Sequence, residues 1–509
     1  MLGILATDMA EKQKTIKDII SPLMPGASLL KGDENLIISG LQLNSLNIKP
    51  GDLFIAVKGN KLDGINFLDD ALNRGAIALA LKQERLNLLK DKDRWKVIIG
   101  LDDPRWATGI MASAFYDYPS RKLSLIGITG TNGKTTTSYL LESIFRVARL
   151  KTGIIGTITH KILDQKIQAK HTTPDAITLQ SLLSLMVERG VEIVCAECSS
   201  HALKQDRVSG CRFRGAIFTN LSQDHLDYHK DMRSYFEAKL RLFTIYSPNF
   251  SVINIDDEWG RRLFNITLGQ KLSYGFSPQA MIRPLKWSQD IEGIRSRLIT
   301  PKGFLDITSR LIGRHNLYNI MAAVATAISL GLDLRAIAFG IAACSNVSGR
   351  LERVKAPLDI LALVDYAHSP DALLKVLTSI REIKCDNRLI VVIGCGGDRD
   401  RTKRPIMAKI ASKLSDLAIF TSDNPRNEDP DAILKDMISG LDKEQLENTL
   451  VIPDRREAIF EAVRSASKGD IILIAGKGHE TYQIVGNRRI DFDDRKVLQE
   501  ALLEIFGEK

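Results

Sequence analysis

Long apolar runs are missing from this chain of 509 residues. No stretch reaches the roughly 18 consecutive apolar residues that indicate a membrane-spanning helix. Met1 to Met24 mixes charged residues with short apolar runs and lacks the continuous apolar block of a secretory signal. We therefore expect a cytoplasmic protein without membrane insertion.

Cysteine is sparse, with six residues in the whole chain, which is typical of thiols that stay reduced. The Cys-x-x-Cys pair at Cys195 and Cys198 would suit metal or redox chemistry, or burial in a strand. Because no second pair accompanies it and its surroundings are strand-like, we predict that this pair consists of buried structural cysteines. The cluster Gly394-Cys-Gly-Gly397 lacks the spacing of a dinucleotide fingerprint, which argues against a redox cofactor.

Blocks of consecutive basic residues are also absent, although the chain is basic overall. Lysine and arginine number 70 against 61 acidic residues, which gives a net charge of +9. This excess favours either nucleic acid or small polyanionic substrates. Without a basic block or an aromatic–basic stripe we expect no nucleic-acid partner, so a nucleic-acid-binding protein is an alternative that rests on charge alone.

The length predicts about three domains. We place them at 1–101, 102–346 and 347–509, with a polar break at Asp102-Asp-Pro104 and another near Asn346. Strand-like and helical patterns alternate in the second and third regions, which predicts an α/β fold with doubly wound, mostly parallel sheets. The first region reads as a smaller α/β domain, and residues 250–310 show only weak patterning after a strand at Phe250 to Asn254.

A glycine-rich turn between an apolar strand and a helix dominates the second region. Its sequence is Ile126-Gly-Ile-Thr-Gly-Thr-Asn-Gly-Lys-Thr-Thr-Thr137. Glycines let backbone N–H groups converge on phosphates, a lysine reaches the β- and γ-phosphates, and the following threonine hydroxyl suits Mg²⁺. The general phosphate-loop pattern requires glycine where this chain has Ile128, so we interpret the turn as a phosphate loop of a particular subclass.

Polar residues follow the next two strands, where ligands collect in such sheets. Glu197 comes after the strand at Val191 to Cys195, and His225 after the strand at Gly215 to Thr219. A carboxylate and an imidazole near a phosphate loop predict a nucleotide-bound Mg²⁺. Asn316 and Asn319 share one helix face, and their spacing suits helix capping and adenine or ribose binding equally.

Several motifs together resemble the Mur ligase family, the ATP-dependent amino-acid ligases of peptidoglycan precursor synthesis, and within it the MurE group. They occur in order along all three regions: Gly127-Ile-Thr-Gly-Thr-Asn-Gly-Lys-Thr-Thr136, Thr172-Thr-Pro174, Glu197-Cys-Ser-Ser-His201, Asp224-His-Leu-Asp-Tyr-His229, Asp365-Tyr-Ala-His-Ser-Pro-Asp371, Gly396-Gly-Asp-Arg-Asp400 and Gly476-Lys-Gly-His-Glu480. The resemblance implies a UDP-binding first domain, an ATP-binding central domain and a Rossmann-like C-terminal domain that receives the amino acid.

The resemblance also implies site residues. The catalytic and Mg²⁺-binding residues would be Lys134, Thr135, Glu197, His225 and Lys239, the last as a carbamate. The ATP site would comprise Gly130, Thr131, Asn132, Gly133, Lys134, Thr135, Thr136, Asn319, Arg350 and Asp365. Contacts to UDP-N-acetylmuramoyl-L-Ala-D-Glu would come from Ser45, Thr172, Thr173, Ser199, Gln205 and Arg207. Those to the incoming amino acid would come from Arg399, Asp423, Asn424, Arg426, Gly476 and Glu480.

The loop Asp423-Asn-Pro-Arg426 resembles that of ligases that add meso-diaminopimelate. A forked guanidinium suits the second carboxylate of this amino acid, and an acid suits its second ammonium. We therefore expect a monomeric ligase that adds meso-diaminopimelate through an acyl phosphate. A lysine-adding ligase of the same family and a plain phosphate-loop ATPase are the alternatives.

Two departures from the family pattern concern other parts of the chain. The first domain reads Asn44-Ser45-Leu46 where the family usually has Asp-Ser-Arg, and His315 replaces the commoner phenylalanine. The first departure leaves the uridine contacts open. We expect neither departure to touch the ATP or the amino-acid loops.

Overall fold

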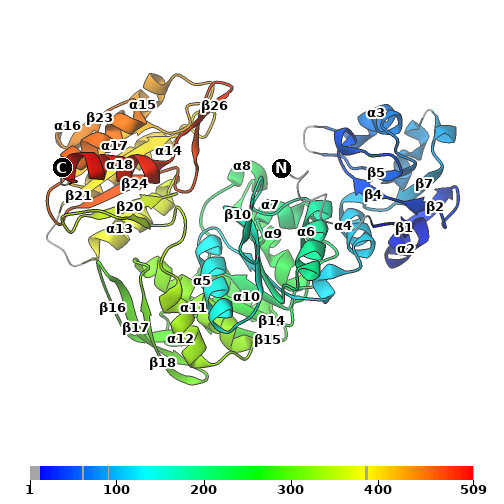
Figure 1. Ribbon diagram of the computed structural model, residues 1–509, viewed down its shortest axis with the longest axis horizontal. Helices are drawn as coiled ribbons and strands as arrows, with labels where there is room; N and C mark the ends of the chain where they lie inside the picture. The colour runs from blue at the N-terminus through cyan, green and yellow to red at the C-terminus, as the bar shows by residue number, and fades with distance from the viewer. Residues whose placement is uncertain (1–11, 60–61, 90, 384–387, 508–509) are drawn as a thin grey trace.

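The computed structural model describes residues 12–59, 62–89, 91–383 and 388–507. Cys385 and the start of the chain up to residue 11 lie outside the described residues. Each of the three large sheets takes its strands from one of the three predicted regions (Figure 1). The predicted α/β class is confirmed, while the exact domain limits stay a prediction.

The N-terminal sheet has five strands in the order β2-β7-β6-β5-β4. They are β2 (Ala27–Lys31), β4 (Gly40–Gln42), β5 (Asp52–Ala56), β6 (Ala78–Lys82) and β7 (Val97–Leu101). All neighbours are parallel except β2 and β7. Helix α4 (Pro104–Phe115) buries Met111 and Phe115 in the core of this sheet, and on its other side it packs against α6 (Ala176–Glu188) of the central domain.

The central sheet has eight strands in the order β11-β10-β9-β12-β8-β13-β14-β15. They are β8 (Ser124–Thr129), β9 (Thr152–Ile155), β10 (Thr159–Ile162), β11 (Gln165–Gln168), β12 (Ile193–Glu197), β13 (Gly215–Phe218), β14 (Phe250–Asn254) and β15 (Gln270–Tyr274). In the order of the sheet, the six neighbouring strands β9, β12, β8, β13, β14 and β15 are parallel. Strands β10 and β11 add an antiparallel edge next to β9. The carboxyl ends of β8, β12 and β13 therefore meet at one edge of the sheet, as the sequence predicts.

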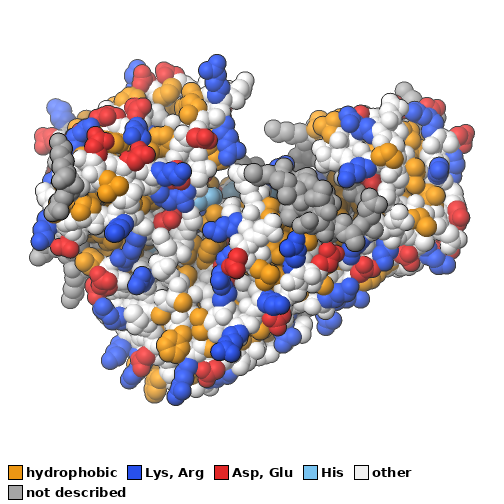
Figure 2. All heavy atoms as spheres, in the orientation of Figure 1, with side chains coloured by type: hydrophobic (Ala, Val, Ile, Leu, Met, Phe, Trp, Pro, Cys, Tyr) orange, Lys and Arg blue, Asp and Glu red, His pale blue; other side chains and the backbone are white. Residues whose placement is uncertain are grey.

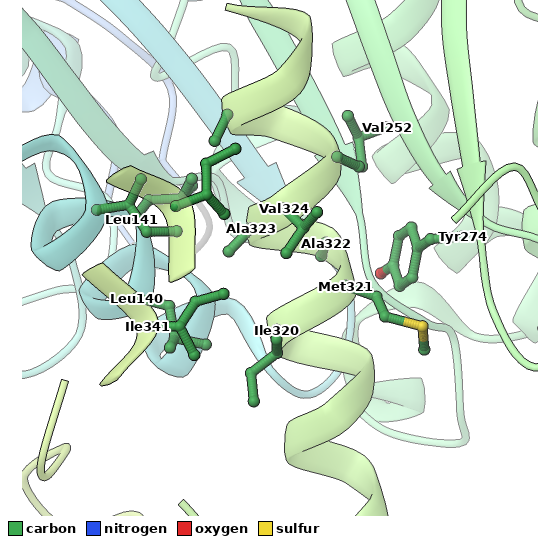
Figure 3. Packing of buried hydrophobic residues seen from close by; sticks show 14 of the residues in the cluster. Leu140, Leu141, Val252, Tyr274, Ile320, Met321, Ala322, Ala323, Val324 and Ile341 are labelled. Atoms are coloured by element: carbon green, nitrogen blue, oxygen red, sulfur yellow. The ribbon is translucent and has the colours of Figure 1, made fainter. Parts of the chain in front are cut away.

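Helix α11 (Arg314–Ser329) is the buried centre of this domain. It is rich in alanine, so neighbouring elements approach it closely (Figure 3). Leu140 and Leu141 of α5 (Lys134–Val147) pack on one side, and Val252 and Tyr274 of the sheet lie on the other. This packing fixes the start of α11 beside the phosphate loop.

The weakly patterned segment before α11 forms a three-stranded antiparallel sheet. Its strands are β16 (Arg283–Asp290), β17 (Gly293–Thr300) and β18 (Gly303–Ser309). Only β17 and β18 alternate cleanly between buried and more exposed positions, whereas β16 has no fully buried residue. The sequence signal of β16 is correspondingly weak.

The C-terminal sheet has the order β19-β20-β24-β21-β22-β23 and is parallel except for β19. Its strands are β19 (Glu352–Val354), β20 (Leu361–Asp365), β21 (Leu389–Cys395), β22 (Leu417–Ser422), β23 (Thr449–Val451) and β24 (Ile471–Ala475). Its helices are α13 (Pro370–Arg381), α14 (Lys403–Leu414), α15 (Pro430–Ile438), α16 (Lys443–Glu447), α17 (Arg455–Arg464) and α18 (Asp494–Phe506). A hairpin of β25 (Tyr482–Val485) and β26 (Arg488–Asp491) follows β24.

Cys195 and Cys198 are buried, and burial raises the pKa of both thiols, so the prediction of structural cysteines is confirmed for this pair. No helix in the described part of the chain has the length and apolar character needed to cross a membrane.

Candidate active site

The phosphate loop connects β8 to α5 and owes its shape to two glycines. Gly130 and Gly133 have φ values of 150° and 88°, in the region that favours glycine. A Cβ atom on Gly130 would lie 1.8 Å from Oγ1 of Thr219, and one on Gly133 would lie 2.3 Å from Oδ1 of Asn319. The loop is thus packed too tightly for any side chain at these two positions.

Two lysines converge on the carbonyl oxygen of Gly130. Lys134 Nζ donates to it at 2.8 Å and to the carbonyl of Thr131 at 2.9 Å, while Lys239 Nζ, from α9 (Met232–Thr244), donates to it at 2.9 Å. Burial lowers the pKa of Lys134. The pKa of Lys239 falls well below its ordinary value because the side chain is buried and lies close to the charge of Lys134. The two amines thus crowd the same carbonyl oxygen, and this crowding favours the neutral form of Lys239.

Glu197, the last residue of β12, places its carboxylate beneath the loop. Its Oε2 accepts hydrogen bonds from the hydroxyls of Thr135 at 3.0 Å and Thr157 at 2.8 Å, and its Oε1 accepts from the Thr157 amide at 3.1 Å. The side chain is only 1% exposed. A buried carboxylate beside a threonine hydroxyl is an oxygen donor set that fits Mg²⁺.

A cavity of about 520 Å³ opens between the phosphate loop, the start of α11 and helix α13 of the C-terminal domain. Among the predicted ATP residues, its wall includes Asn132, Gly133, Thr135, Thr136, Asn319, Arg350 and Asp365. Neither asparagine of α11 caps the helix, because its N-cap is Gly313 without a side-chain hydrogen bond, and a contact to adenine or ribose stays a prediction. Asn316 bonds the Ile312 carbonyl at the helix start, and Asn319 bonds Asn316 while facing Gly133.

A second cavity, of about 320 Å³, lies between the N-terminal and central domains. Gln205 and Arg207 line it, and they join a chain of hydrogen bonds. Arg207 donates to Gln205 Oε1 at 2.7 Å and to the Thr173 carbonyl at 3.1 Å. Thr173 in turn bonds Ser199 and the Glu197 carbonyl, and Thr172 bonds Thr157. Five predicted UDP-substrate residues therefore form one network that reaches the phosphate loop.

Ser45 is the predicted substrate residue that lies apart from this network. Its side chain is buried in the N-terminal domain, and its hydroxyl lowers the pKa of Asp70 of α3 (Leu68–Asn73). The preceding Asn44 caps a short turn through the amide of Leu46. The Asn-Ser-Leu sequence thus stabilises a turn in the N-terminal domain.

His225 lies in a group of aromatic rings that includes His201, Tyr228 and His229. Its ring centroid is 4.9 Å from that of His201, which lies 4.2 Å from Tyr228 and 5.3 Å from His229. Burial, and then the nearby positive groups, lowers the pKa of His229 to about 4. Tyr228 also receives a hydrogen bond from Gln205 at 3.0 Å, which ties this group to the substrate network.

The predicted amino-acid residues gather where three strands of the C-terminal sheet end. The loops after β21, β22 and β24 carry Arg399, Asn424 and Glu480 respectively. Arg399 is exposed, and its guanidinium donates to the Asp398 carbonyl at 3.3 Å. Asn424 Nδ2 donates to Glu480 Oε2 at 2.9 Å, and Arg426 Nη1 donates to the Gly397 carbonyl at 2.7 Å. A Cβ on Gly476 would lie 2.8 Å from Oδ2 of Asp423, so this glycine too keeps the loops in contact.

Comparison with known proteins places this architecture in one family. Three family models match the chain: the Mur ligase family catalytic domain at 37–113, the Mur ligase middle domain at 128–327 and the Mur ligase glutamate ligase domain at 349–478. The UDP-N-acetylmuramoyl-L-alanyl-D-glutamate--2,6-diaminopimelate ligase of Gloeobacter violaceus is 47% identical, over 91% of this chain and 94% of that protein. The chain belongs to the Mur ligase family.

Further similar proteins support this assignment. The ligase of the same description from Geobacter metallireducens is 43% identical to this Mur ligase, over 96% of this chain and 97% of that protein. A solved structure of a 2,6-diaminopimelate ligase aligns with a TM-score of 0.70 and 32% identity, covering 96% of this chain and 99% of that one. The sequence-based assignment to an ATP-dependent, amide-bond-forming ligase family is confirmed.

Sequence reasoning missed several polar residues of this Mur ligase site. They are Thr157 beside Glu197, Tyr228 beside Gln205, Asp371 beside the phosphate loop and Lys477 beside Glu480. The motifs that carried the family resemblance include three of these residues, Tyr228, Asp371 and Lys477. Membership in a motif was therefore the sequence signal that could have identified them as site residues. Thr157 comes shortly after β9, and its position beyond the end of a strand was the only signal for it in the sequence.

Proposed function

We propose that this Mur ligase joins meso-diaminopimelate to UDP-N-acetylmuramoyl-L-Ala-D-Glu at the expense of ATP. The observation that carries the proposal is the cluster of Asn424, Arg426 and Glu480 at the ends of the C-terminal strands. It offers an acid for an ammonium and a guanidinium for a carboxylate, which are the two groups at the distal end of this amino acid. The 2,6-diaminopimelate ligases that the chain resembles support the same substrate.

In the proposed reaction the γ-carboxylate of the D-glutamyl residue attacks the γ-phosphorus of ATP. A new C–O–P linkage forms, the bond to the β-phosphate oxygen breaks, and ADP leaves. The neutral amine of the amino acid then attacks the acyl carbon, phosphate leaves, and the nitrogen loses a proton as the amide forms. Lys134 would stabilise negative charge on the phosphates during transfer, and loop amides would orient them.

Mg²⁺ fits the donors that this chain provides. Thr135 and Glu197 would hold one ion, and His225 lies in the neighbouring ring cluster for a second. A carbamate on Lys239 would add two further oxygens, and the lowered pKa of that amine favours the neutral form that carbon dioxide requires. When bound, the ions would neutralise charge on the nucleotide phosphates.

Arg426 is the proposed discriminator between meso-diaminopimelate and lysine. Its backbone adopts φ 53° and pairs with the hairpin, because the amide of Arg426 donates to the Ile484 carbonyl and the Gly486 amide donates back. The guanidinium is thereby fixed near Gly397. Lysine has no second carboxylate to pair with it, so lysine would leave a desolvated charge unmatched.

Incubation with UDP-N-acetylmuramoyl-L-Ala-D-Glu, ATP and either amino acid tests the proposal. We expect ADP release with meso-diaminopimelate to exceed release with lysine by at least about a hundredfold. Arg426→Ala should lose most of that preference, and the adjacent Asn427→Ala serves as control. Faster release with lysine would establish the lysine-adding alternative, and undiminished ATP turnover without either acceptor would establish a plain ATPase.

We place this reaction in the cytoplasm, where ATP is available, and we propose a monomer as the active form. Each of the three domains contributes to a site within one chain, and both cavities lie within that chain. Sedimentation at assay concentrations, with and without substrates, tests the oligomeric state. A dimer that forms only with substrates would contradict the monomer.

A further inference from the structure

Lys477 is a fully buried cation within the amino-acid pocket. Its side chain is 0% exposed, and its Nζ lies 3.1 Å from Glu480 Oε2, 3.3 Å from Asn424 Oδ1 and 4.0 Å from Asp423 Oδ1. A buried ammonium is costly unless acceptors surround it, and these three oxygens supply them. The reaction steps above give this lysine no task.

Among the described residues, hydrogen-bond donors reach only one of the two carboxylate oxygens of Glu480. Both Lys477 Nζ and Asn424 Nδ2 donate to Oε2, the latter at 2.9 Å. Within the described part of the chain Oε1 receives no hydrogen bond, and the side chain is 18% exposed. One oxygen is therefore anchored, and the other is left for a ligand.

Asn424 is oriented by the same lysine. Its Oδ1 accepts from Lys477 Nζ and from the Ile484 amide of the β25–β26 hairpin, at 2.9 Å. With the oxygen turned toward these two donors, the Nδ2 group must face Glu480. The Nδ2 group of Asn424 carries two N–H bonds, and one of them donates to Glu480. Among the described residues the second N–H has no acceptor and is available to a ligand.

We propose that Lys477 is a positioning residue for amino-acid specificity, acting through Glu480 and Asn424. By holding Glu480 Oε2 and Asn424 Oδ1 it turns Glu480 Oε1 toward the distal ammonium of the incoming amino acid. The free N–H of Asn424 is turned toward the distal carboxylate. This inference rests on the proposed function, because it deepens the same amino-acid site.

Simple charge attraction and positioning predict opposite effects of removing this lysine. Asp423, Glu480, Lys477 and Arg426 together carry a formal charge of 2 − 2 = 0, and replacing the lysine by methionine would make it −1. A more negative pocket attracts an ammonium more strongly. Positioning predicts weaker binding instead, because Glu480 and Asn424 lose the donor that fixes their orientation.

The experiment is a double-mutant cycle on the full chain with Lys477→Met, Glu480→Gln and the double variant. We expect Lys477→Met to raise the KM for meso-diaminopimelate at least about tenfold, while the KM for ATP changes less than about twofold. The double variant should lose less than the product of the two single effects, because the lysine acts in part through that carboxylate and in part through Asn424. Lys468→Met, whose side chain is 74% exposed in the same domain, is the matched control.

Three results would overturn the inference: an unchanged or lower KM for meso-diaminopimelate in Lys477→Met, effects that multiply in the double variant, or equal losses for ATP and the amino acid. If Lys477→Met melts below the assay temperature, Lys477→Gln is assayed in its place, with the same expectations. The wild-type comparison of meso-diaminopimelate with lysine is made first. If lysine proves to be the substrate, the proposed function fails separately, and the cycle is run with lysine, whose side-chain ammonium would meet the same Glu480 oxygen.

Discussion

At the scale of single residues, the buried Glu197 joins the phosphate loop to the substrate network. Its carboxylate accepts from Thr135 and Thr157, and its main-chain carbonyl accepts from Thr173. The same residue therefore contacts both the predicted ATP site and the predicted UDP-substrate site. A substitution that removes only the charge of Glu197 should therefore lower catalysis while the fold is kept.

We predict that Glu197→Gln lowers kcat by about a hundredfold or more, because an amide is a poor substitute for a carboxylate at a metal or transition-state charge. Substrate KM values should change much less. Steady-state assays over a range of Mg²⁺ concentrations measure both effects. Glu237→Gln, on exposed α9 surface, is the control, and a variant with unaltered kcat at every Mg²⁺ concentration would rule out this role for Glu197.

Lys239 provides a second residue-scale prediction, which concerns pH. Because its pKa is lowered in the folded protein, the neutral amine is present at a pH where an exposed lysine is still charged. The amine must be neutral to react with carbon dioxide, so carbamate should increase as pH rises from about 7 to about 9. The free energy of unfolding should change in the same direction. Between the lowered pKa of Lys239 and its pKa in the unfolded chain, the unfolded state binds more protons, so the contribution of this group to stability increases as pH rises.

Carbon-13 bicarbonate and NMR measure this carbamate directly. We expect one carbamate resonance in the wild type, its loss in Lys239→Met, and its retention in Lys166→Met, where the replaced lysine is exposed on β11. A resonance that persists in Lys239→Met would assign the modification to another amine. Activity of Lys239→Met should fall together with the resonance.

At the scale of elements, helices α17 and α18 hold the strand ends that carry the amino-acid loops. Arg455 and Asp494 form an ion pair at 2.7 Å, and both side chains are 0% exposed. The same guanidinium donates to the carbonyl of Ala475 at 3.0 Å and to that of Ser422 at 3.4 Å, the last residues of β24 and β22. The pair thus ties two helices to the bases of two loops.

We predict that Arg455→Met lowers the free energy of unfolding by about 3–5 kcal/mol, because it leaves Asp494 buried without a partner. Arg455→Met combined with Asp494→Leu should recover most of this loss, since an apolar pair needs no partner. Urea unfolding measures the free energy of unfolding of both variants. Arg456→Met, next in the chain and paired with Glu500 at the surface, should cost less than about 1 kcal/mol, and equal losses at both arginines would contradict the argument.

The elements also show what the sequence could and could not predict. Buried parallel strands with helical crossovers give a strong pattern, so β8, β13 and β21 and their polar loops were predictable. Strand β16 and the β25–β26 hairpin expose much of their surface, so their apolar pattern is weak. Contacts such as that between Lys477 and Asn424 join residues 53 positions apart, and only the fold brings them together.

At the scale of the whole molecule, the three domains enclose a hollow in which the substrates would meet. The space-filling view shows a wide notch between the C-terminal and N-terminal domains, above the central domain, with histidine and basic side chains on its walls (Figure 2). The phosphate loop belongs to the central domain and the amino-acid loops to the C-terminal domain. If these predicted sites hold the substrates, we expect catalysis to depend on how the C-terminal domain docks on the phosphate loop.

One docking contact is made by Asp371 at the start of α13. Its Oδ2 accepts from Asn132 Nδ2 of the phosphate loop at 3.3 Å and from Ser222 Oγ at 2.9 Å. Lys375, one turn later in α13, donates to the same oxygen at 2.8 Å. The contact joins the C-terminal domain to two loops that follow central strands.

We predict that Asp371→Ala speeds amide exchange in the phosphate loop and in the first turn of α13 by about tenfold, because hydrogen bonds to a charged acceptor contribute about 1.5 kcal/mol to docking. Hydrogen exchange followed by mass spectrometry measures both segments. Asp431→Ala is a matched control, because α15 begins with the same Pro-Asp-Ala sequence and Asp431 is exposed. Any effect on the helix end alone should appear in both variants, whereas faster exchange in the phosphate loop should appear only in Asp371→Ala. Equal exchange in that loop for both variants would show that docking does not depend on Asp371.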